Sequence, residues 1–170
     1  MQNLTGWTAL PVPNNSSYDF LLNDNIGDVR VQIKTQRCTS QGSQALKEVR
    51  TTYRPMTARE ASRRLPQNMY VVETQRTRTG KTASGGQTRP YRFDEFDILA
   101  VSMYPSTNDW SKFLYTVAHW LLPRSEDNRL LQIFQPVALA PDDVWTDSFE
   151  SCVAWWRSGI KKKILPEDAL

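Results

Sequence analysis

The chain has 170 residues, of which 39% are hydrophobic and 11% aromatic, and its formal net charge is +3. This length suits one compact domain, and the apolar content suffices for a core, which excludes disorder along the whole chain. No apolar run reaches the roughly 18 to 20 residues that cross a bilayer, and the first residues lack the pattern of a signal peptide. We therefore expect a soluble, cytoplasmic protein without membrane contact.

The cysteines and the histidine narrow the possible chemistry. Cys38 and Cys152 are too few for a disulfide framework or a cysteine-rich metal cluster. His119 is the single histidine and lies in an apolar context, so a packed or surface role is the simpler interpretation. Zinc sites and Ser-His or Cys-His catalytic pairs have little support.

The first predicted elements form a hairpin. Residues 6–12 favour a short extended segment, and residues 18–22 favour a short apolar strand. A turn over residues 23–28 then leads into residues 29–34, where Val, Val and Ile alternate with Arg, Gln and Lys. Strict alternation of this kind predicts a strand with one apolar and one polar face.

The middle of the chain is less regular. Residues 36–55 are polar and give no clear assignment. Residues 57–65 predict a short basic helix, with Thr57 as N-cap and Glu60 completing a capping box. Residues 69–74 predict a further strand.

The second half contains the most apolar segments. Residues 76–92 are basic and glycine-rich, which predicts an exposed loop. Residues 96–104 are nearly all apolar, as in a strand buried on both faces. Residues 112–122 and 130–137 predict further strands, and residues 145–160 predict a helix by the spacing of their apolar residues. The fold class is therefore α/β or α+β with a mixed central sheet.

Three polar residues of the predicted hairpin have the chemistry that phosphodiester hydrolysis requires. Asp19 would supply a hard oxygen ligand to Mg²⁺, and Gln32 a neutral amide oxygen to the same ion. The carbonyl of Ile33 would add a third ligand. Lys34 lies on the same strand face as Gln32 and would orient the attacking water and offset developing charge.

These residues resemble the motif of the PD-(D/E)XK restriction-endonuclease superfamily. Tyr18-Asp19, a hairpin turn and Gln32-Ile33-Lys34 match its pattern of Asp, a gap and an acid-x-Lys strand, in the variant with Gln at the acid position. Some restriction enzymes and intron-encoded homing endonucleases carry this variant. The later segment 92–101 looks like a core strand of that fold.

The resemblance implies a restriction-endonuclease-like mixed sheet flanked by helices, in a single nuclease-like domain over residues 1–170. Its core would be about residues 6–120, with further strands and a helix in residues 121–165. It also implies a metal-dependent deoxyribonuclease that uses Mg²⁺, for which Mn²⁺ would substitute, and acts on double-stranded DNA in restriction, mobile-element or repair biology. Cutting both strands with one site per chain implies a homodimer or higher oligomer. The family's helix before the first strand, often with a Glu, would be missing or supplied by a partner.

The predicted loop is the candidate DNA-binding segment. Its basic residues, which would contact backbone phosphates, are Arg76, Arg78, Lys81, Arg89 and Arg92. A solvated loop is the alternative. Gly80-Lys81-Thr82 lacks the full spacing of a phosphate-binding loop, so we expect no nucleotide cofactor.

Other interpretations remain open. Glu73 and Asp97 are candidate additional acids, although a carboxylate in such a position is more often a salt-bridge or turn residue. The main alternative function is a non-catalytic DNA-binding or assembly module with a degenerate nuclease fold. A third is a protein-interaction domain that uses the aromatic C-terminal helix.

Overall fold

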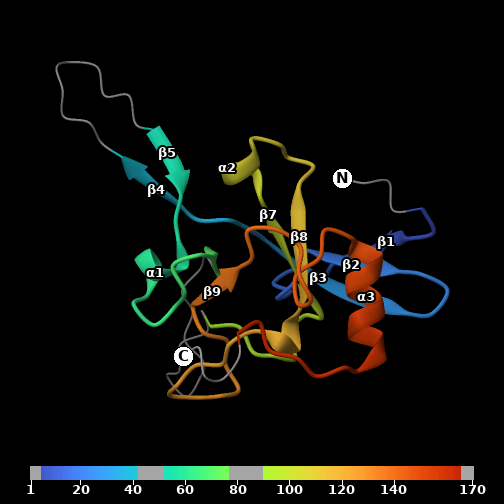
Figure 1. Cartoon of the computed structure of the whole chain (residues 1–170). Coiled ribbons are helices and arrows are strands. Elements are labelled where there is room, and N and C mark those ends of the chain that lie inside the picture. Colours follow the sequence, from blue (N-terminus) through green and yellow to red (C-terminus); the bar gives the residue numbers. More distant parts are fainter. Residues whose placement is uncertain (1–4, 42–51, 77–89, 166–170) are drawn as a thin grey trace.

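The computed structural model describes residues 5–41, 52–76 and 90–165. It has a mixed five-stranded sheet in the order β1-β2-β3-β7-β8 (Figure 1). The strands are β1 Thr8–Leu10, β2 Phe20–Asn23, β3 Asp28–Thr35, β7 Ile98–Ser102 and β8 Phe113–Val117. Strands β3 and β7 are parallel, and the other neighbours are antiparallel. The predicted α+β class with a mixed central sheet is confirmed.

The predicted hairpin is present as β2 and β3, and its turn is anchored on the C-terminal part of the chain. The Asp24 carboxylate accepts hydrogen bonds from the backbone N–H groups of Ile26 and Gly27. Gly27 has a φ of 153°, which a side chain would strain. Arg157 donates to both Asp24 carboxylate oxygens at 2.7 Å. This side-chain hydrogen bond holds the pKa of Asp24 well below its ordinary value.

The register assigns each residue of β3 to a face of the sheet. Ile33 pairs with Ala100 of β7, and Ala100 pairs with Tyr115 of β8, so these three side chains share one face. Gln32 and Leu99 are paired on the opposite face. All five residues of β7 are buried, which agrees with the prediction of a strand covered on both faces.

Helix α3 (Phe149–Ser158) covers the Tyr115 face of the sheet. The Phe149 ring packs edge-on against Tyr115, with centroids 5.7 Å apart, and against Trp7 at 5.2 Å. The helix begins at its N-cap Ser148 rather than at residue 145, because Thr146 pairs with Tyr115 as an isolated β-bridge. Phe149, Cys152 and Val153 of the helix are buried within the chain, and Trp155 and Trp156 are half-buried.

Several short elements surround the sheet. The unassigned segment 36–55 contains two strands, β4 Cys38–Gln41 and β5 Thr52–Pro55, which pair and extend away from the five-stranded sheet (Figure 1). Strands β6 (Tyr70–Glu73) and β9 (Phe134–Val137) form a second two-stranded sheet. These strands were not predicted, because the segment is polar and lacks an alternating apolar pattern. Strands β4 and β5 pair with each other in a separate two-stranded sheet.

Helical segments are shorter than the sequence predicts. Helix α1 (Ala58–Ala61) has the predicted capping box, but it ends at Ala61 because Ser62 is extended. Helix α2 (Tyr104–Thr107) precedes β8. Strand β8 ends before a 3-10 turn, η1 (Ala118–Trp120), where Ala118 donates to the carbonyl oxygen of Asp97.

One buried apolar cluster joins early and late segments of the chain. It includes Val31 of β3, Leu99 of β7, Trp120 of η1 and Trp145, each at most 4% exposed. No helix in the described residues is long and apolar enough to cross a membrane.

Candidate active site

The antiparallel register of β2 and β3 brings Asp19 and Gln32 together. Phe20 pairs with Val31, so Asp19, the residue before it, lies opposite Gln32. The Asp19 backbone N–H donates to the carbonyl of Val31 at 2.9 Å and extends the ladder by one position. The hairpin predicted from the sequence is thus the element that brings the two candidate residues together.

The three groups proposed as metal ligands, the Asp19 carboxylate, the Gln32 amide and the Ile33 carbonyl, lie close together. Gln32 is only 3% exposed. Its Nε2 lies 2.5 Å from Oδ2 of Asp19 and 3.0 Å from the carbonyl oxygen of Ile33. The same Oδ2 accepts the backbone N–H of Ile33 at 2.8 Å. The Asp19 side chain itself is exposed, so the group is open to solvent on one side.

Lys34 lies beside this group with its ammonium partly buried. Its Nζ donates to the carbonyl oxygen of Gln75 at 3.1 Å and lies 5.2 Å from the ring centroid of Tyr91. Burial lowers the pKa of Lys34 below its ordinary value, and the nearby carboxylate of Asp19 partly opposes that shift. A lysine in such surroundings releases its proton more readily than a solvated one.

Tyr91 and Arg76 complete the wall of the site. The Arg76 guanidinium lies 5.3 Å from the Tyr91 ring centroid and forms an ion pair with Glu95. Burial, more than the charge of Asp19, raises the pKa of Tyr91 to about 12. Tyr91 is therefore uncharged at neutral pH. Its ring contacts the ammonium of Lys34, and its hydroxyl does not serve as an acid or base.

The sequence did not identify Tyr91, because it lies within a segment predicted as an exposed loop. An isolated bridge between Gln75 and Pro90 brings the two ends of that segment together and places Tyr91 against β3. The alternation of Tyr91 and Phe93 around Arg92 was the available signal for a chain that enters the core.

Asp97 does not join the predicted acids. The parallel register places Asp97 beside Arg30, two residues before Gln32 along β3. Asp97 is 6% exposed, and its carboxylate accepts Arg30 Nε at 3.1 Å, Nη2 at 2.7 Å and the backbone N–H at 2.8 Å. Glu73 is likewise engaged, in an ion pair with Arg37. The salt-bridge interpretation holds for both acids.

The residues at the site fit a magnesium ion of modest affinity. Mg²⁺ takes oxygen ligands, and the Asp19 carboxylate, the Gln32 amide and the Ile33 carbonyl are all of this kind. The Gln32 Nε2 donor lies near two of these oxygens, as a cation would. Ligation would require the amide to turn so that its oxygen replaces its nitrogen. A single carboxylate predicts weaker binding than the two or three acids of a typical site.

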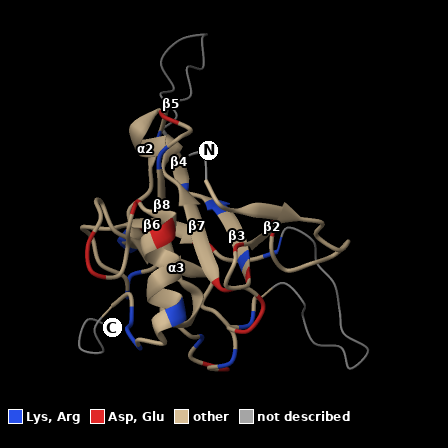
Figure 2. Cartoon of the chain, turned by 90° about the vertical axis from the view of Figure 1, so that its right-hand side faces the viewer, with Lys and Arg blue, Asp and Glu red and all other residues tan. Residues whose placement is uncertain are grey.

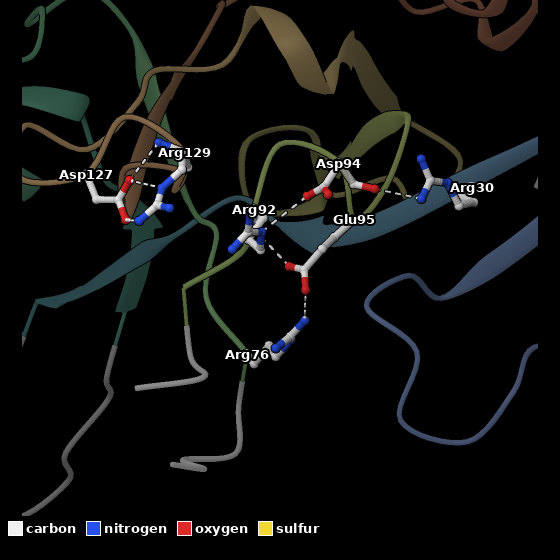
Figure 3. Close-up of polar contacts among 7 residues, drawn as sticks. All are labelled: Arg30, Arg76, Arg92, Asp94, Glu95, Asp127 and Arg129. Atoms are coloured by element: carbon white, nitrogen blue, oxygen red, sulfur yellow. Dashed lines mark hydrogen bonds and ion pairs between the residues drawn. The ribbon is translucent and has the colours of Figure 1, made fainter. Parts of the chain in front are cut away.

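The predicted DNA-binding residues fall only partly within the described chain. Arg78, Lys81 and Arg89 lie outside the described residues. Arg76 and Arg92 are described, and both contact acids: Arg76 pairs with Glu95, and Arg92 lies 3.5 Å from Asp94 (Figure 3).

These pairs belong to a larger pattern. Figure 2 shows basic and acidic residues interspersed along the lower edge of the molecule rather than one uniformly basic face. Pairs of this kind in Figure 3 include Arg129 with Asp127 at 2.8 Å. The number of Lys and Arg residues in the sequence therefore overstates the positive field of the described surface, because several of them are paired with acids.

His119 lies on the surface at the end of the sheet. It is exposed and stacks on the half-buried ring of Phe93, with centroids 6.2 Å apart and planes 11° from parallel. It is not among the contacts of Asp19, Gln32 or Lys34, in agreement with the surface role expected of it.

No protein-family model, curated protein or solved structure matches the chain. Its function must therefore be inferred from the geometry and chemistry of its own residues.

Proposed function

We propose that the protein is a magnesium-dependent DNA endonuclease with a PD-(D/E)XK-like site formed by Asp19, Gln32, Ile33 and Lys34. The observation that carries this proposal is the convergence of the Asp19 Oδ2, the Ile33 carbonyl and the Gln32 amide, beside a partly buried lysine.

Each residue has a defined task in the proposed reaction. Asp19, Gln32 and the Ile33 carbonyl would hold Mg²⁺, which supplies Lewis-acid stabilisation of the charge that develops on the phosphate. Lys34 orients the attacking water and, in its neutral form, accepts a proton from it. Tyr91 and the carbonyl of Gln75 keep the Lys34 amine in place.

The proposal includes a biological assembly. Because one such site cleaves one strand, cutting of double-stranded DNA is expected to require a homodimer or higher oligomer. Light scattering of the protein with and without DNA measures this directly.

A non-catalytic DNA-binding or assembly module is the second candidate. The engagement of Asp97 by Arg30 favours it, because Asp19 is then the only acid among the site's predicted ligands. Nicking of supercoiled plasmid in Mg²⁺ or Mn²⁺ separates the two. Plasmid that stays intact in both metals, together with a gel shift in Ca²⁺, would support the module and contradict the nuclease.

Gln32→Glu is expected to strengthen metal binding. The new carboxylate would lie beside the Asp19 Oδ2, where two like charges repel unless a cation separates them. We expect the Mg²⁺ dissociation constant to fall by about tenfold, equivalent to about 1.4 kcal/mol. Titration of the protein's thermal stability with MgCl₂ measures this without any reference to cleavage.

Gln132→Glu is the control, since it introduces the same charge at a second glutamine, which is half-buried. It should leave the metal titration unchanged. An equal response of the two variants would mean that Gln32 is not a ligand.

The pH dependence of cleavage follows from the buried environment of Lys34. Burial disfavours the charged amine, so the neutral form accumulates at lower pH than for a solvated lysine. The single-turnover rate is expected to rise with pH and level off below the ordinary lysine value of about 10.4. A rate that still rises above that value would exclude Lys34 as the proton acceptor.

A further inference from the structure

A pocket of about 640 Å³ opens between η1 and the chain that follows α3. Its lining combines aromatic rings with a run of lysines: Phe93, His119, Trp120, Trp156 and Lys161–Lys163. Among the described residues, no aspartate or glutamate lines it. This composition suits a ligand with a flat ring and a negative charge.

The rings provide a stacking surface. His119 is exposed, and its ring lies nearly parallel to that of the half-buried Phe93, with centroids 6.2 Å apart. Exposed aromatic and histidine rings are the surfaces on which unpaired nucleic-acid bases stack. A fully paired base would not reach it, because its faces are covered within the helix.

The lysines provide the charge, and they differ in their roles. Lys162 lies 5.4 Å from the Trp120 ring centroid and 3.9 Å from the Asp143 carboxylate, so it supports the structure of the pocket. Lys161 is exposed and forms no ion pair with any described residue. It is therefore available to a phosphate beside a stacked base.

The pocket lies close to the candidate active site along the chain. Tyr91 contacts Lys34. Phe93 follows Tyr91 by two residues, so the Cα atoms of Tyr91 and Phe93 are at most about 7 Å apart. One DNA strand rises about 3.4 Å per nucleotide. A strand cleaved beside Lys34 would thus present a nucleotide to the pocket within a few steps of the cleaved phosphate.

We propose that this pocket binds an unpaired base and its phosphate in a DNA strand. Its position relative to the cleaved bond rests on the proposed nuclease function, whereas the binding itself does not. The protein would accordingly favour DNA with an overhang, flap or mismatch over a fully paired duplex.

Fluorescence anisotropy in EDTA tests the proposal without any cleavage. The probes are a blunt duplex, the same duplex with a short single-stranded extension, and a third whose extension carries abasic sites. Stacking of one base predicts about fivefold or more tighter binding of the intact extension than of the other two. Equal affinity for intact and abasic extensions would overturn the proposal, since charge alone would then explain the binding.

Point variants locate the effect. His119→Ala is expected to remove most of the preference, and Lys161→Ala to reduce it, with little change in blunt-duplex affinity. Trp110→Ala and Lys112→Ala are the matched controls, because they remove an exposed ring stacked on Tyr104 and an exposed lysine at the opposite end of β8. A preference that survives His119→Ala, or that Trp110→Ala removes as well, would also overturn the assignment.

The outcome for the pocket is separable from the outcome for the nuclease. Lys34→Ala should keep the preference in full, because Lys34 does not line the pocket. A protein that cleaves DNA but binds the three probes equally refutes the pocket alone. A protein that shows the preference but never cleaves refutes the nuclease alone.

Discussion

Replacing Lys34 with alanine is expected to lower the rate of DNA cleavage by about 10²- to 10⁴-fold, the usual contribution of a positioned acid or base. The dissociation constant for DNA should change little, because the amine acts on the attacking water in the transition state. Single-turnover cleavage and anisotropy on the same oligonucleotide measure the two quantities. Parallel losses in both would make Lys34 a simple phosphate contact.

Lys34→Arg sharpens the interpretation of that result. Arginine keeps the positive charge but stays protonated at any accessible pH. An inactive arginine variant would indicate that Lys34 must give up its proton, whereas retained activity would assign it an electrostatic role alone. The buried position beside Tyr91 and the carbonyl of Gln75 makes proton release the expected role.

Removing the side chain of Arg30 is expected to give the largest loss of stability. Arg30→Met would leave the carboxylate of Asp97 buried with only the backbone N–H as donor. Loss of one partner of a buried pair costs about 3 to 5 kcal/mol, and the partial exposure of Arg30 places our expectation below that range, at about 2 to 3 kcal/mol. Urea denaturation at constant pH measures the change in the free energy of unfolding.

Arg54→Met is the matched control for this experiment. It breaks the pair between Arg54 and Glu60, in which both side chains are more than a third exposed. A surface pair contributes about 0 to 1 kcal/mol, so the two variants should differ clearly. Equal losses would mean that solvent reaches the Asp97 carboxylate once Arg30 is removed, and Asp97 would become a candidate ligand once more.

The sequence alone determined the hairpin and the first part of the candidate site. A period of two over Val29 to Lys34 specifies which side chains share a face, and a short turn fixes which residue of β2 lies opposite Gln32. Because both constraints are local, Asp19, Gln32 and Lys34 could be grouped without knowledge of the tertiary structure. The buried strand β7 was recognisable for the same reason, since its five residues are almost wholly apolar.

The tertiary structure decided what surrounds those residues. The parallel pairing of β3 with β7 joins segments more than sixty residues apart. Its register places the Asp97 carboxylate against the Arg30 guanidinium and not beside Asp19. The wall of Tyr91 and the pocket beside Phe93 likewise depend on contacts between distant segments. No local period encodes such contacts, because they are selected by the packing of the whole core. The sequence therefore determined which groups could act, and the packing decided which of them remained available.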